Sequence, residues 1–101
     1  MQARREDRVK DAHLGEEFVV ELRENPTTGF RWRVVAAGDP ICEFMGDDFE
    51  HGRAPGEGGT HRWRYLAAQP GETRIELILE RPWARSAEPA ERFSLRVRVL
   101  S

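Results

Sequence analysis

The sequence predicts an all-β fold, an immunoglobulin-like β-sandwich of about seven strands. Apolar and polar residues alternate in several short runs, and clusters rich in glycine, proline and aspartate separate these runs. Alternation with a period of two is typical of strands that bury one face, and no segment of ten or more residues shows the period of an amphipathic helix. A chain of 101 residues suffices for one modest core, so we expect a single domain over residues 1–101.

The alternating runs define five strands. In chain order they cover residues 18–22, 32–36, 63–67, 75–79 and 93–99. Their polar positions are mostly arginine and glutamate, which predicts a solvated sheet face whose charges discourage edge-to-edge pairing. Ahead of them we expect a short edge strand near residues 8–10, with residues 1–7 disordered.

The segment 42–50 is ambiguous. Three large apolar side chains in it, Phe44, Met45 and Phe49, are available for the core. The two aspartates at positions 47–48 are more typical of a turn than of a catalytic carboxylate pair. Because the strands of a sandwich run back and forth between its two ends, the placement of the later loops depends on this segment containing one strand.

The first of three unusual loops is Asn25-Pro26-Thr27-Thr28-Gly29. Proline favours extended geometry in the asparagine before it and pre-sets a turn, and the glycine permits a positive φ. The two threonines are stiff at χ1, so the loop is expected to present two hydroxyls in a nearly fixed shape. From this local chemistry alone, a proline-initiated turn without a function is an equally good interpretation.

The second unusual loop runs from Arg53 to Gly59 and is rich in glycine. No Lys-Ser/Thr pair follows the glycines and no helix begins there, which argues against a phosphate-binding loop. Glycines also let the backbone of a partner approach closely. Taken alone, this loop is better explained as a flexible hairpin tip.

The third unusual loop begins with Arg81-Pro82-Trp83. Proline ends the preceding strand, and the tryptophan either packs back onto the core or stays exposed beside the arginine. An exposed Trp-Arg pair is typical of the anchor of a protein–protein interface. Alternate connections of a sandwich lie at one end, so all three loops are expected to cluster there if segment 42–50 holds one strand.

Together these motifs resemble the chagasin-like inhibitors of papain-like cysteine proteases. The resemblance spans about residues 13–100 and rests on three motifs in the same order. They are Asn25-Pro26-Thr27-Thr28-Gly29-Phe30 followed by Trp32, Gly56-Glu57-Gly58-Gly59-Thr60, and Arg81-Pro82-Trp83. It implies a reversible inhibitor, a monomer without cofactors, whose partners are papain-like cysteine proteases.

The resemblance also implies how the protein binds. Loops 25–29, 53–60 and 81–85 would occlude the active-site cleft of the protease as a wedge, with Thr27 nearest the catalytic Cys–His pair. The glycine-rich loop would lie along the cleft through backbone hydrogen bonds, and Arg81 and Trp83 would brace the other flank. The protease-binding residues that it implies are Asn25, Pro26, Thr27, Thr28, Gly29, Phe30, Gly56, Glu57, Gly58, Gly59, Arg81, Pro82 and Trp83.

The sequence gives little support for an enzymatic function. Cys42 follows Ile41 in an apolar context and is expected to be a small buried side chain. His51 and His61 lack the spacing of metal ligands, so no metal site is expected, and no nucleophile–base arrangement stands out. The net charge of −2 with closely mixed signs argues against nucleic-acid binding, and no apolar run approaches the roughly 18 residues of a membrane helix.

A carbohydrate- or peptide-binding module on the same sandwich is the alternative. Trp32, Trp63 and Trp83 would then form an aromatic platform, although the first two fall in the inward register of their strands. The basic N-terminus is not followed by an apolar stretch, so no signal peptide is expected. A cytoplasmic protein and a mature periplasmic or secreted form are both compatible with the sequence, and the single cysteine excludes an intramolecular disulfide.

Overall fold

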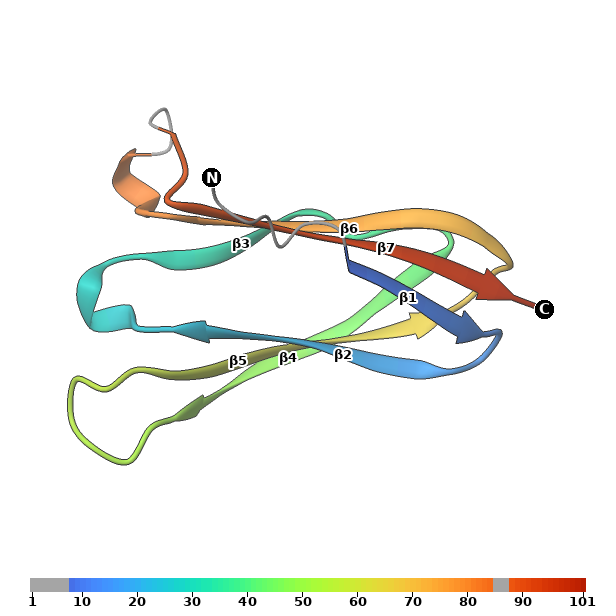
Figure 1. The fold of residues 1–101 in the computed structure, drawn as a ribbon. Helices are drawn as coiled ribbons and strands as arrows, with labels where there is room; N and C mark the ends of the chain where they lie inside the picture. Colours follow the sequence, from blue (N-terminus) through green and yellow to red (C-terminus); the bar gives the residue numbers. More distant parts are fainter. Residues whose placement is uncertain (1–7, 85–87) are drawn as a thin grey trace.

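A computed structural model describes residues 8–84 and 88–101, and it confirms the predicted all-β sandwich of seven strands. One sheet has four strands in the order β1-β7-β6-β3, and the other has three in the order β2-β5-β4. The two sheets lie face to face (Figure 1). The strands are β1 (Arg8–His13), β2 (Glu17–Glu24), β3 (Arg31–Ala36), β4 (Cys42–His51), β5 (Gly59–Ala67), β6 (Gly71–Glu80) and β7 (Glu91–Leu100).

The core lies between the inner faces of the two sheets, as the alternation predicts. In β7 every second residue from Phe93 to Val99 is buried, namely Phe93, Leu95, Val97 and Val99. Between them, Arg96 and Arg98 lie on the outer face. The other buried apolar residues are Ala12, Phe18, Val20, Cys42, Trp63, Tyr65, Ala67, Ile75 and Leu77. No helix in the part of the chain that the structure describes is long and apolar enough to cross a membrane.

The ambiguous segment is a single strand, β4, and its details correct the sequence analysis. The register of β4 against β5 shifts between Phe44 and Gly46, where the glycine has a φ of 134°. Such a bulge changes which residues face inward. Phe44 and Met45, expected as core candidates, are 44% and 43% exposed, although the Phe44 ring still lies 5.6 Å from that of Tyr65. The two aspartates at positions 47–48 lie within the strand and form no turn.

The three unusual loops lie at one end of the sandwich, as strand parity predicts. They connect β2 to β3, β4 to β5 and β6 to β7, and all three appear at the left of Figure 1. The connections β1–β2, β3–β4 and β5–β6 lie at the opposite end, where the chain ends after β7. Because β4 is one strand, the sheet order brings loops that are far apart in sequence to a common edge.

Candidate functional site

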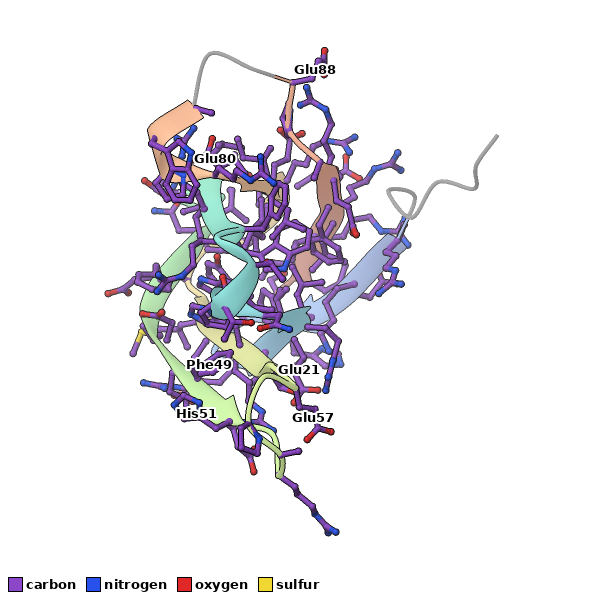
Figure 2. All side chains as sticks on the ribbon, turned by 90° about the vertical axis from the view of Figure 1, so that its left-hand side faces the viewer. Glu21, Phe49, His51, Glu57, Glu80 and Glu88 are labelled. Atoms are coloured by element: carbon purple, nitrogen blue, oxygen red, sulfur yellow. The ribbon has the colours of Figure 1, made fainter. Side chains whose placement is uncertain are left out.

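We call the end formed by residues 25–30, 52–58 and 81–84 the loop edge. It contains the first loop between β2 and β3, the second between β4 and β5, and the start of the third after β6. The first and third loops each contain a single 3-10 turn, Pro26–Thr28 and Pro82–Ala84. Figure 2 looks onto this edge, with His51 at the end of β4 and Glu57 of the second loop on one side, and with Glu80 and Glu88, which flank the third loop, on the other.

The shape of the first loop is set by Asn25. Its side-chain Oδ1 accepts a hydrogen bond from the backbone N–H of Thr27 at 3.1 Å, which caps the 3-10 turn. Its backbone carbonyl accepts from the N–H of Thr28, also at 3.1 Å. The turn ends at Gly29, which has a φ of 86° and donates its N–H to Pro26 O at 3.0 Å. The predicted roles of Asn, Pro and Gly in shaping this loop agree with this geometry.

Both threonine hydroxyls are already used as donors inside the first loop. Thr27 Oγ1 donates to Asn25 Oδ1 at 2.6 Å, and Thr28 Oγ1 donates to the Asn25 carbonyl at 2.7 Å. The two side chains are exposed. The exposed surface of this loop therefore offers their methyl groups and the remaining lone pairs of the oxygens, and not the two O–H donors expected from the sequence.

The second loop is closed by contacts of its own. Glu57 Oε1 accepts the N–H of Ala54 at 2.8 Å, and Glu57 N donates to Ala54 O at 3.1 Å. At the base, Gly52 N donates to Gly58 O at 2.6 Å, and a Cβ on Gly52 would lie 2.7 Å from that same oxygen. These hydrogen bonds close the loop into a compact turn. The Glu57 carboxylate serves to hold it together.

The loops contact one another through the first loop. Asn25 Nδ2 donates to Gly56 O at 3.0 Å, which ties the first loop to the second. A Cβ on Gly58 would lie 2.9 Å from Glu24 O, so the glycine is what allows the two backbones to approach. A Cβ on Gly29 would lie 2.7 Å from Cη2 of Trp83, which places the third loop against the first.

Trp83 is 73% exposed and therefore not part of the core. The sequence was compatible with either a buried or an exposed Trp83, and in the structure the side chain is exposed. Beside it, the Arg81 guanidinium lies 4.5 Å from the centroid of the Phe30 ring, which holds the arginine over the base of the first loop. Pro82 is exposed between them.

Not all residues expected at the interface are equally accessible. Gly59 is buried at the start of β5, where a Cβ would clash with the backbone of Glu50. Its part is to permit the close pairing that supports the second loop. Phe30 is half-buried at the base of the first loop, and its N–H lies 3.3 Å from Thr28 Oγ1. Arg85, expected at the end of the third loop, lies outside the described residues, as do residues 1–7.

Beneath the loop edge, the ionisable side chains of Glu24, His61 and Asp47 form a network that connects the strands next to the first and second loops. Glu24, which is 4% exposed, accepts the backbone N–H of Trp32 at 2.7 Å through Oε2 and lies 2.8 Å from His61 Nδ1 through Oε1. His61 Nε2 is 2.6 Å from Asp47 Oδ2. The imidazole stacks on Trp63 with ring centroids 4.0 Å apart.

Sequence reasoning missed this network, although one signal was available. The inward register of β2 (18, 20, 22) continues to position 24, which places a carboxylate on the core face directly before Asn25. A buried carboxylate requires hydrogen-bond partners. The sequence does not reveal which strand supplies them.

The other features of the described chain do not form an active site. Cys42 is fully buried, and burial raises the pKa of its thiol, so a reactive thiolate is disfavoured. No group of three or more potential metal ligands occurs among residues 8–84 and 88–101. Trp63 is buried and Trp32 is half-buried, with its indole N–H bonded to Arg23 O at 2.8 Å. Trp83 is thus the one tryptophan that faces outward, which is a poor platform for sugar.

Fold and loop edge together define a β-sandwich with three neighbouring loops gathered at one end. A family model described as chagasin family peptidase inhibitor I42 matches residues 11–97. Amoebiasin-1 of Entamoeba histolytica is 35% identical over 91 residues, which cover 84% of this chain and 83% of that protein. The chain therefore belongs to the chagasin family of peptidase inhibitors, and the resemblance found in its loop motifs is confirmed.

Solved structures agree with the fold. The cysteine protease inhibitor EhICP2 of Entamoeba histolytica matches with a TM-score of 0.84 at 20% identity, over 94% of this chain and 88% of that one. Leishmania mexicana ICP matches with a TM-score of 0.69 at 26% identity, over 94% and 90%. PbICP-C, solved in complex with falcipain-2, matches with a TM-score of 0.63 at 18% identity, over 98% and 92%.

Proposed function

We propose that the chain inhibits papain-like cysteine proteases reversibly by placing its loop edge in their active-site cleft. The chain is a cysteine protease inhibitor by family and not an enzyme, so no catalytic residue or cofactor is required of it. The observation that carries the proposed mode of binding is the contact of both outer loops with the first one, through Asn25–Gly56 and Gly29–Trp83.

Rigidity makes the loop edge suitable for this task. The first and second loops are each closed by their own hydrogen bonds, and the Asn25–Gly56 bond joins them. A surface that is ordered before binding loses little conformational entropy when it docks. Three loops that contact a protease at once are enough to bury an interface of ordinary size without folding any new segment.

The three loops have different roles in this proposal. Thr27 lies on the exposed face of the central loop and enters the cleft nearest the catalytic Cys–His pair. Its turn is hydrogen-bonded at both ends, so it blocks the nucleophile without aligning a scissile carbonyl with the oxyanion hole. The second loop offers backbone groups at Gly56, and Trp83 supplies the aromatic anchor on the opposite flank.

Titration of papain with the purified protein tests the proposal. We expect stoichiometric, reversible loss of activity, with the inhibitor recovered uncleaved. Thr27→Arg places a long charged side chain at the centre of the wedge and should abolish inhibition while the protein stays folded, because Thr27 is exposed. Falcipain-2, the partner of a protein with the same fold, is a useful second enzyme. Absence of inhibition of several such proteases at micromolar concentration would overturn the proposal.

A further inference from the structure

The imidazole of His61 lies between two carboxylates, and this arrangement requires an additional proton. Nδ1 is 2.8 Å from Glu24 Oε1, and Nε2 is 2.6 Å from Asp47 Oδ2. A neutral imidazole has one N–H donor and one lone pair, whereas a carboxylate only accepts. Only the doubly protonated ring donates to both carboxylates. Without the extra proton, one ring lone pair faces a carboxylate oxygen.

The surroundings of the ring leave these two carboxylates as its ionic partners. Glu24 comes from β2 and Asp47 from β4, and their side chains are 2% and 45% exposed. On β5 itself, Arg62 follows His61 but is paired with carboxylates of Glu21 and Glu50, on the other face of the sheet. From β3, the backbone N–H of Trp32 donates to the Glu24 carboxylate.

Two aromatic rings pack against the imidazole, and one further titratable group lies near Asp47. His61 stacks on Trp63 and has an edge contact with Phe49 at 6.0 Å. Tyr65, four residues after His61 on the same face of β5, has its pKa raised by burial, then by the charges of Cys42 and Asp47. It stays neutral over the pH range in which histidine changes its charge. On β4, the Phe49 ring that contacts His61 also contacts His51, with ring centroids 4.9 Å apart.

The residues of the network lie on the strands that adjoin the first and second loops. Glu24 directly precedes Asn25, and its carbonyl lies against Gly58. His61 follows the second loop by two residues on β5, and Asp47 belongs to the strand that leads into the same loop. The imidazole therefore contacts both the residue that precedes the first loop and the strand that leads into the second loop.

We propose that Glu24, His61 and Asp47 are positioning residues for inhibition, which hold the first and second loops together in acidic solution and release one contact in alkaline solution. Asp47 is the more exposed carboxylate and is expected to be the one that separates, because water can solvate it. This inference rests on the proposed function, since its consequence is a change in inhibition with pH.

The variant Asp47→Asn tests the inference directly. An asparagine amide can donate to a neutral ring Nε2 while Nδ1–H still donates to Glu24, so the network is satisfied without the extra proton. We expect the inhibition constant of the original protein for papain to rise about tenfold more between about pH 5.5 and about pH 8.5 than that of Asp47→Asn. Both are measured on the same enzyme, so the pH dependence of the protease cancels.

The control is His13→Gln, which removes a histidine at the opposite end of the sandwich and should follow the original protein at both pH values. Nitrogen-15 NMR of the free inhibitor gives an independent readout: the His61 ring should carry two N–H groups at about pH 5.5. A singly protonated ring there, or parallel pH profiles of the original protein and Asp47→Asn, would overturn the inference. Lack of inhibition at every pH would instead remove the proposed function, while the NMR result still reports on the network.

Discussion

Trp83 rests on Gly29. The absence of a side chain on the glycine leaves room for the indole, and a Cβ at this position would lie 2.7 Å from Cη2 of Trp83. The same glycine has a φ of 86°, which ends the 3-10 turn of the first loop. One residue thus sets the shape of the central loop and the place of the neighbouring loop.

Gly29→Ala should weaken inhibition and lower stability together. The methyl group would displace the indole, and alanine in the left-handed region costs about 1–2 kcal/mol. Thermal unfolding and papain titration measure the two effects. Gly15→Ala is the matched control, because Gly15 has a φ of 90° and no atom within 4 Å of a built Cβ, at the other end of the sandwich. It should share the loss of stability but not the loss of inhibition. Equal inhibition by both variants would contradict the role given to the Trp83–Gly29 contact.

Trp83→Ala should weaken binding by about 2 kcal/mol or more, about thirtyfold, because tryptophan is one of the residue types most often found as a hot spot of protein–protein interfaces. The melting temperature should change little, since the side chain is 73% exposed. Leu14→Ala removes an apolar side chain that is 49% exposed at the opposite end, and it should leave inhibition unchanged. A large loss of stability with unchanged affinity would show that the indole supports the fold and does not anchor the protease.

Asn25→Asp separates the two tasks of this side chain. The carboxylate keeps the acceptor for Thr27 N and Thr27 Oγ1, but it cannot donate to Gly56 O. We expect the first loop to keep its conformation while the tie to the second loop is lost, with about tenfold weaker inhibition. Amide hydrogen exchange, faster at Gly56 and its neighbours than in the original protein, would accompany the loss. Unchanged exchange and affinity would show that the 3.0 Å bond does not couple the loops.

The hydroxyl of Tyr65 is buried without a hydrogen-bond partner among the described residues, and burial is the main cause that raises its pKa to about 12. Because its pKa is higher in the folded than in the unfolded chain, ionisation has no effect on stability well below its ordinary value of 10.0, but it favours the unfolded chain as the pH rises from there toward 12. Stability should therefore decline between these pH values.

Absorbance of the phenolate gives the titration of this residue alone, because the chain contains one tyrosine. In Tyr65→Phe the decline should be absent, and the variant should be at least as stable as the original protein at neutral pH, since an unpaired buried hydroxyl is lost. A phenolate signal that appears near pH 10 without unfolding would contradict the burial of this group.

The sequence was sufficient for the architecture and for the position of the loops. Alternating residues located the strands because a half-buried sheet imposes a period of two on side chains. Strand parity then placed Thr27, Gly56 and Trp83 at one end. These predictions depend on local patterns and on a count of strands, both of which can be read along the chain.

What the sequence did not reveal depends on cross-strand register. The bulge in β4 exposes Phe44 and Met45, although their composition suits a core. The partners Glu24 and His61 are 37 positions apart and meet only because β2 pairs with β5 in one particular register. The threonine hydroxyls of the first loop donate to Asn25. The sequence alone does not show which acceptor a hydroxyl will bind.

The separation of the two ends of the sandwich has a practical consequence. Ser101 follows β7 and lies at the end away from the loop edge (Figure 1). A fluorophore, affinity tag or solid support joined there would leave all three loops facing the solution. If proteases bind at the loop edge as proposed, a protein attached in this way would capture them on a surface. Its loops could then be randomised for new targets while Asn25 and Gly29 are kept to preserve the shape of the first loop.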